Sequence, residues 1–136
     1  MPYVTQTARD QLAPARKPQN VGELNFVLTK LADDYVKAAG LNYTTINQVV
    51  GGFALVERVF LDSKPAKDDP ATRELKLAND IFVVCADYYK ARVNGATSDV
   101  EAAQTTCDIF GVLRCACDEF QRRVTADYED GKIEEN

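Results

Sequence analysis

The chain contains no histidine and only two serines, Ser63 and Ser98. A serine hydrolase needs a serine nucleophile within reach of a histidine base, so that catalytic triad cannot be assembled. The missing histidine also excludes a mixed cysteine and histidine zinc site. No Gly-x-Gly-x-x-Gly motif and no phosphate-binding loop ending in Gly-Lys-Ser or Gly-Lys-Thr is present. We therefore expect a protein that is not an enzyme and that uses neither a metal nor a cofactor.

The sequence also lacks a signal peptide and any apolar run long enough to cross a membrane. Its net charge is -5. Proteins that bind duplex nucleic acid without sequence preference need a basic face, and this acidic balance argues against one. We expect a cytoplasmic protein that binds neither membranes nor duplex nucleic acid. Its 136 residues suit a single domain, residues 1–136.

Apolar residues repeat in steps of three and four along most of the chain, which is the pattern of amphipathic helices. The pattern predicts four main helices, at residues 23–39, about 45–61, 70–92 and 98–124. Gly40 fits a helix end, and Ser98 with Glu101 fits a helix start. The segment Pro2–Thr5 is short and β-like. Apolar stripes this long cannot all be covered in a thin bundle, so we expect a mainly α, oligomeric helical assembly.

The long C-terminal helix carries an apolar stripe that we expect to pack against the other helices. Its members are Val100, Ala103, Cys107, Phe110, Leu113, Cys117, Phe120 and Val124. Cys115 and Cys117 are two residues apart and point to different sides of a helix, so they are poorly placed to pair or to share a metal. The four cysteines, which include Cys85, are predicted to be small buried hydrophobic residues.

Two adjacent glycines, Gly51 and Gly52, lie in the middle of the second predicted helix. Each costs about 1 kcal/mol relative to alanine in a helix interior. A cost at both positions indicates that something approaches the helix closely at this point. Close packing of a second helix and close approach of a ligand are the two explanations.

Arginine is the side chain best suited to phosphate, because its guanidinium group binds two oxygens at once. Six arginines lie near helix ends or on the last helix: Arg58, Arg73, Arg92, Arg114, Arg122 and Arg123. The last three have acidic neighbours four residues away, at Asp118 and Glu119, so ordinary surface ion pairs are the alternative explanation. Arg92 and Asn94 follow Tyr88 and Tyr89, and this group has the chemistry to stack on a base and read its edge. Helix-ending chemistry is the alternative for Arg92 and Asn94.

Several segments resemble a family of small phage and prophage proteins. They are the opening Met1–Val4, Gly22–Leu31, Tyr43–Asn47, Phe120–Val124 and the end Tyr128–Asn136, which reads Tyr-Glu-Asp-Gly-Lys-Ile-Glu-Glu-Asn. Most members are shorter and have no counterpart to residues 52–110. Because periodicity gives no packing role to the tail, we expect it to fold back on Pro2–Thr5 or to cross to a partner subunit.

A longer helical phage protein of this kind is similar to the Thoeris anti-defence signal sponges. Those proteins bind cyclic ADP-ribose isomers, and some also bind cyclic oligonucleotides, without cleaving them. They are homo-oligomers with pockets at subunit junctions. The resemblance implies Phe82, Arg92 and Asn94 as contacts for a base. It implies Arg58, Arg114, Arg122 and Arg123 as contacts for the phosphates.

Two functions follow as hypotheses. The first is a phage sponge that sequesters a cyclic nucleotide immune signal in the cytoplasm of an infected bacterial host. The second is a non-catalytic helical scaffold that docks on a host or virion partner through its apolar stripes.

Overall fold

The computed structural model describes residues 17–62, 75–93 and 98–135. The helices are α2 (Val21–Ala39), α3 (Tyr43–Asp62), α5 (Lys76–Arg92), α6 (Asp99–Phe120) and α7 (Ala126–Glu135), and a π-helical turn (Gln121–Thr125) joins α6 to α7. These bounds confirm the predicted mainly α fold with four main helices and a long C-terminal one. The described part contains no strand, and the β-like segment Pro2–Thr5 lies outside it.

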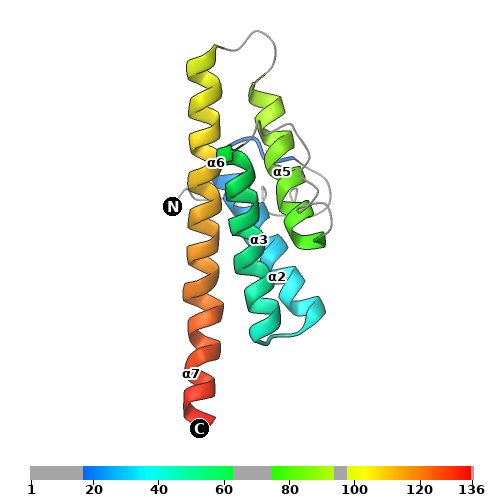
Figure 1. Cartoon of the computed structure of the whole chain (residues 1–136), viewed down its shortest axis with the longest axis vertical. Helices are drawn as coiled ribbons and strands as arrows, with labels where there is room; N and C mark the ends of the chain where they lie inside the picture. Colours follow the sequence, from blue (N-terminus) through cyan, green and yellow to red (C-terminus); the bar gives the residue numbers. More distant parts are fainter. Residues whose placement is uncertain (1–16, 63–74, 94–97, 136) are drawn as a thin grey trace.

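The helices form a bundle in which consecutive helices α3 and α5 run in the same direction (Figure 1). Helices α2 and α6 run in the opposite direction and lie side by side. Helices α2 and α6 both contact α3 and α5; α2 packs more extensively on α5, and α6 packs more extensively on α3. Two parallel pairs of this kind are the arrangement of bundles that contain a long crossover connection. Here residues 63–74 join α3 to α5.

The helix boundaries follow from local hydrogen bonds. Asn20 caps α2, because its side-chain oxygen accepts a hydrogen bond from the Glu23 amide at 2.9 Å. Asn42 accepts one from the Thr45 amide at 2.9 Å, one residue before α3 begins. Gly40 ends α2 with a φ of 95°, a conformation that favours glycine. The predicted cap at Ser98 is confirmed, since its hydroxyl accepts from the Glu101 amide at 3.2 Å.

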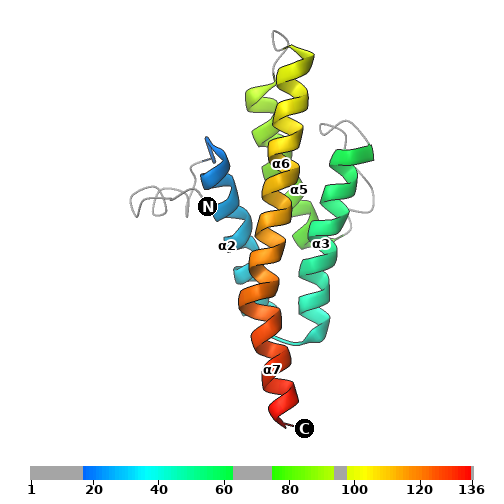
Figure 2. The same cartoon turned by 90° about the vertical axis from the view of Figure 1, so that its left-hand side faces the viewer.

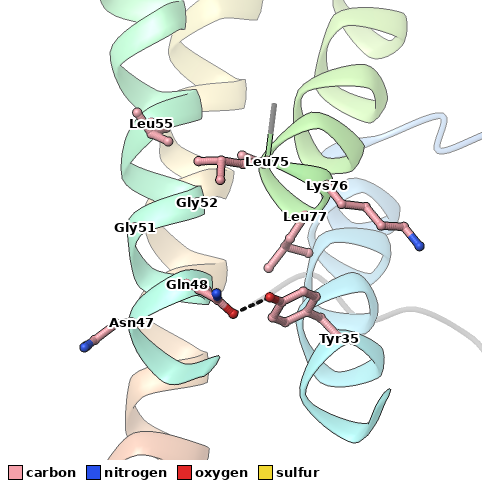
Figure 3. A pocket seen from close by; sticks show the side chains of 10 residues that line it. Tyr35, Asn47, Gln48, Gly51, Gly52, Leu55, Leu75, Lys76 and Leu77 are labelled. Atoms are coloured by element: carbon pink, nitrogen blue, oxygen red, sulfur yellow. Dashed lines mark hydrogen bonds between the residues drawn. The ribbon is translucent and has the colours of Figure 1, made fainter. Parts of the chain in front are cut away.

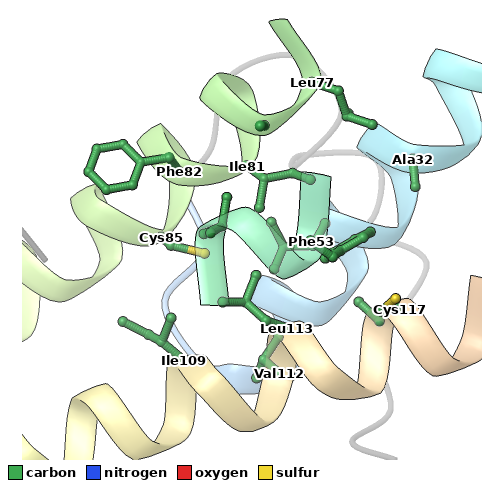
Figure 4. Close-up of a cluster of buried hydrophobic side chains, with 14 of the residues drawn as sticks. Ala32, Phe53, Leu77, Ile81, Phe82, Cys85, Ile109, Val112, Leu113 and Cys117 are labelled. Atoms are coloured by element: carbon green, nitrogen blue, oxygen red, sulfur yellow. The ribbon is translucent and has the colours of Figure 1, made fainter. Parts of the chain in front are cut away.

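All four helices of the bundle contribute to one apolar core (Figure 4). Among its fully buried side chains are Leu24, Leu28, Val49, Phe53, Val56, Ile81, Cys85, Ile109 and Leu113. One continuous apolar core therefore joins α2, α3, α5 and α6.

The predicted stripe of α6 is wrong in its first half. Val100 is 78% exposed, and Ala103 and Cys107 are exposed too. The bundle instead covers the opposite side of the helix, which carries Thr105 and Ile109. The reason is that this part of α6 has apolar residues on two faces, and the other helices pack on the face that carries Ile109 and Val112.

The four cysteines divide into two pairs. Cys85 and Cys117 are buried, as predicted, whereas Cys107 and Cys115 are exposed. Burial raises the pKa of the Cys85 thiol far above its usual range, and burial also raises the pKa of Cys117. The two buried thiols therefore stay protonated and act as small apolar side chains.

The C-terminal tail continues the line of α6 as helix α7 rather than turning back along the bundle (Figures 1 and 2). Tyr128 of this tail packs against Tyr43 at the start of α3. The tail thus contacts α3 of its own chain, a partner that the sequence did not predict; the expected partner Pro2–Thr5 lies outside the described residues. None of the helices in the described ranges is long and apolar enough to span a membrane.

Candidate functional site

Two predicted phosphate ligands, Arg122 and Arg123, lie in the π-helical turn and form ion pairs. Arg122 Nη2 is 2.6 Å from Glu119 Oε1. Arg123 Nη2 is 3.2 Å from Asp33 Oδ1 on α2, and its Nε is 3.4 Å from Glu119 Oε1. Both guanidinium groups are therefore occupied by carboxylates within the chain, and Arg123 joins α2 to the end of α6.

Arg114 and Arg58 lie further along the bundle. Arg114 Nε is 3.6 Å from Glu57 Oε2 on α3, and its guanidinium group is 5.9 Å from the centroid of the Phe110 ring. Burial raises the pKa of Glu57, while the nearby Arg114 charge lowers it and Asp118 raises it further. Arg58 is exposed on α3.

Arg92 lies at the end of α5, and its contacts include the Tyr88 ring and the Gln19 backbone. Its guanidinium group stacks on Tyr88, 4.7 Å from the ring centroid, and donates a hydrogen bond to the carbonyl of Gln19. Arg92 and Tyr88 line a surface hollow of about 410 Å³ together with Lys17, which pairs with Asp87 at 3.7 Å. Arg92 thus attaches the segment before α2 to the end of α5. Asn94 lies outside the described residues.

Phe82, the predicted partner for a base, is a core residue. It is only 6% exposed, and its ring centroid is 6.0 Å from that of Phe60. A single chain therefore does not gather the predicted residues that the structure describes around one ligand. Their role at a junction between subunits stays a prediction.

A different group of residues lines a pocket between α3 and the start of α5 (Figure 3). Its volume is about 310 Å³, at the lower end of the range for small-molecule sites. The lining residues are Tyr35 of α2, Asn47, Gln48, Gly51, Gly52 and Leu55 of α3, and Leu75, Lys76, Leu77 and Ala78 at the start of α5. We call this cavity the α3–α5 pocket.

The glycine pair explains why there is space here. A Cβ atom at Gly51 would meet nothing within 4 Å, so this glycine opens onto the pocket. A Cβ atom at Gly52 would lie 3.8 Å from the Cα of Ala78, which is ordinary van der Waals contact between α3 and α5. The first explanation for the glycine pair, close packing of a second helix, thus fits Gly52. The second explanation, close approach of a ligand, has room at Gly51, which faces open space.

Polar groups stand on two sides of a mainly apolar pocket. The Tyr35 hydroxyl donates a hydrogen bond to Gln48 Oε1 and so links α2 to α3 at one edge (Figure 3). Asn47 and Lys76 are exposed. Leu75 is the N-cap residue of α5, and its apolar side chain makes no capping hydrogen bond with the first backbone amides of the helix.

The side chains that line the α3–α5 pocket can make both hydrogen bonds and apolar contacts with a small molecule. Its lining offers an aromatic ring, two amides and one ammonium group around apolar walls, and it includes neither a carboxylate nor a thiol. Over the described ranges, no three cysteine, aspartate or glutamate side chains are grouped so as to hold a metal ion. A small molecule with a flat apolar part and polar edges matches this lining.

Sequence reasoning missed Tyr35, Gln48 and Lys76 as lining residues. Tyr35 fitted the apolar stripe of its helix, and Gln48 and Lys76 look like ordinary solvent-facing side chains. The signal that pointed to this place was the glycine pair, because its cost in helix stability required an explanation.

Comparison with known proteins gives one match. A family model described as a domain of unknown function (DUF6899) matches residues 1–61, which is less than half of the 136 residues. No curated protein and no solved structure matches the chain. The matched region contains α2 and all of α3 except its last residue, so it carries Tyr35, Gln48 and the glycine pair. The chain is similar to this family over the α2 and α3 sides of the pocket, while the α5 side lies beyond the match.

Proposed function

We propose that the protein binds a small nucleotide signal and sequesters it without cleaving it. The observation that carries this proposal is the α3–α5 pocket, which opens at Gly51 and has polar groups at its edges. Its lining contains no pair of a nucleophile and a base, which favours storage of a ligand over hydrolysis.

The pocket suggests how such a ligand would lie. A base would insert between the apolar walls, with the Tyr35 ring and the Gln48 amide beside it. The pocket volume of about 310 Å³ is small, so the phosphates would remain at the mouth. Lys76 is exposed there and supplies a positive charge.

The class of nucleotide comes from the resemblance to phage anti-defence sponges. It implies a cyclic ADP-ribose isomer, or a cyclic oligonucleotide, made in an infected bacterial host. It also implies a homo-oligomer. The net charge of -5 is compatible with this ligand, because a small anion needs only a local positive group.

Thermal unfolding with a ligand panel tests the proposal. The panel contains cyclic ADP-ribose isomers and cyclic dinucleotides, with ATP as a comparison. A ligand present at 100 times its Kd stabilises the folded protein by about 2.7 kcal/mol and raises the melting temperature. The ligand should be recovered unchanged after heat denaturation. Absence of a shift with every member at high excess would rule out the proposed function.

Two variants locate the site. Gly51→Phe fills the α3–α5 pocket and should abolish the shift. Ala54→Phe places the same ring on an exposed position of α3 outside the pocket lining and should leave the shift unchanged. If Gly51→Phe still binds and Arg92→Ala does not, the ligand occupies the predicted arginine site instead.

The helical scaffold remains the second candidate. It is favoured by large apolar side chains on the surface, among them Val100 at 78% and Ile133 at 71% exposed. If no nucleotide of the panel shifts the melting temperature, the scaffold function is the one that remains.

A further inference from the structure

From Val100 to Gly111, about three turns, the side of α6 that faces away from the core carries no charged residue. We call it the outer face of α6, and it consists of Val100, Ala103, Gln104, Cys107 and Gly111, all exposed; the exposed Arg114 follows at its C-terminal end. With about 100° between successive residues, these positions lie opposite Ile109 and Ala116, which are fully buried. Figure 2 shows α6 in front of the other described helices, and none of them crosses it.

A helix face in water normally carries charged or strongly polar side chains. The outer face of α6 has one polar side chain, Gln104, and a glycine in mid-helix. Gly111 costs about 1 kcal/mol relative to alanine. A Cβ atom at Gly111 would meet nothing within 4 Å, so packing within the chain gives no reason for glycine there. A backbone that approaches from outside the chain would supply that reason.

We propose that a second copy of this chain covers the outer face of α6, with the two α6 helices antiparallel and Cys107 beside the two-fold axis. Positions at equal distances from Cys107 then face each other. Ala103 of one copy lies opposite Gly111 of the other, so small residues meet and the two backbones can approach closely. Val100 lies at the level of Arg114. The contact is isologous, as in most homodimers.

The charges at the ends of this face select a second copy in the antiparallel direction. Asp99 is exposed at the start of α6, and the Arg114 side chain is 63% exposed despite its contact with Glu57. On a helical projection, both lie on the same side of Val100 and Cys107. The two-fold axis brings Arg114 of each copy to the level of Asp99 of the other. In a parallel, in-register pair, Asp99 of one copy would lie about 22 Å along the helices from Arg114 of the other, so the opposite charges would not meet.

This inference extends the oligomeric part of the proposed function, and its tests use no ligand, so each can fail alone. The first test is the molar mass of the full-length protein by light scattering after size-exclusion chromatography. The wild type should be a dimer. Gly111→Glu should be a monomer, because it puts two carboxylates into the contact. Ala54→Glu adds the same charge to an exposed position on α3 and should remain a dimer.

A wild-type monomer would overturn the proposal. So would a dimer that persists in Gly111→Glu, or one that is lost equally in Ala54→Glu. Glutamate forms helices better than glycine, so Gly111→Glu should keep its helical circular dichroism spectrum.

Cross-linking tests the register. A short bismaleimide, which adds one thiol at each end, should join two chains through Cys107 in a Cys115→Ser protein. It should fail through Cys115 in a Cys107→Ser protein, because the two Cys115 residues would be about 24 Å apart along the helices. Cross-linking through Cys115 alone would contradict the register.

Charge reversal tests the ends of the contact. Arg114→Asp should raise the dimer dissociation constant at least about tenfold, and Asp99→Arg in the same chain should restore it. If the double variant is no tighter than Arg114→Asp alone, Asp99 and Arg114 do not meet across the axis.

Discussion

Tyr43 and Tyr128 pack edge to face, with ring centroids 4.9 Å apart and ring planes at 89°. The first residue of α3 thus contacts the tail helix α7, although Tyr43 and Tyr128 are 85 residues apart in the sequence (128 − 43). Lys132 lies on the Tyr128 ring at 5.4 Å from its centroid. The acidic tail is therefore held by an aromatic contact, although its sequence shows no clear apolar stripe.

Replacing Tyr128 should release the tail. Tyr128→Ala removes the ring contact with Tyr43 and should lower the free energy of unfolding by about 1 kcal/mol. Amide hydrogen exchange in residues 126–135 should become faster. Ile133→Ala in the same helix is the control, because Ile133 is 71% exposed and its loss should change little. Equal effects of the two substitutions would contradict this role of Tyr128.

Thr125, in the π-helical turn, offers a stabilising substitution. Its hydroxyl is buried and has no hydrogen-bond partner among the described residues. Thr125→Val keeps the shape and removes the unpaired group, so stability in urea should rise by about 1 kcal/mol. Thr105→Val should instead be destabilising, because the Thr105 hydroxyl donates to the Glu101 carbonyl at 2.9 Å. If Thr125→Val is less stable than Thr105→Val, the Thr125 hydroxyl has a hydrogen-bond partner in solution.

Gly40, which ends α2, and Gly51 of α3 should respond to alanine in opposite directions. Gly51→Ala should stabilise the protein by about 1 kcal/mol, because the added methyl group meets only the open pocket. Gly40→Ala should destabilise it by about 1 kcal/mol or more, since Gly40 has a φ of 95°. Urea unfolding of both variants measures these differences. A loss of stability in Gly51→Ala would mean that the pocket is filled in solution.

Glu57 should make the stability of the protein depend on pH. Its pKa is raised above the ordinary 4.5, so the folded chain keeps this proton to a higher pH than the unfolded chain. The stabilisation by the protonated form is complete below pH 4.5 and is lost as the pH rises through the folded pKa. Glu57→Gln removes this dependence and should therefore gain stability relative to the wild type between pH 4 and pH 7. A relative loss over that interval would show that the ion pair with Arg114 outweighs burial.

The main helices could be predicted because each carries its own local signals. The first two predicted ranges agree with α2 and α3 within about two residues at each end, since caps such as Asn20 and Gly40 act over a few residues. The face of α6 could not be chosen correctly, because Val100 and Cys107 make one face apolar and Ile109 makes the opposite face apolar. Which side is covered depends on the other helices.

The candidate site was harder to predict than the fold. The pair Glu119 and Arg123 was foreseen because it lies four residues apart on one helix. The partners Asp33 for Arg123 and Glu57 for Arg114 come from other helices, and no local pattern announces them. The same holds for Tyr35, which reaches the α3–α5 pocket from α2.

The π-helical turn Gln121–Thr125 changes which residues of the tail face the bundle. An uninterrupted helix would continue the line of Ile109, Leu113 and Phe120 to Asp127. The wider turn accommodates one extra residue, so everything after it is rotated by about 100° and Tyr128 takes that place. The extra residue of the turn therefore sets the rotation of α7 about the helix axis. Removing it would let a regular α-helix present the same tail face to Tyr43.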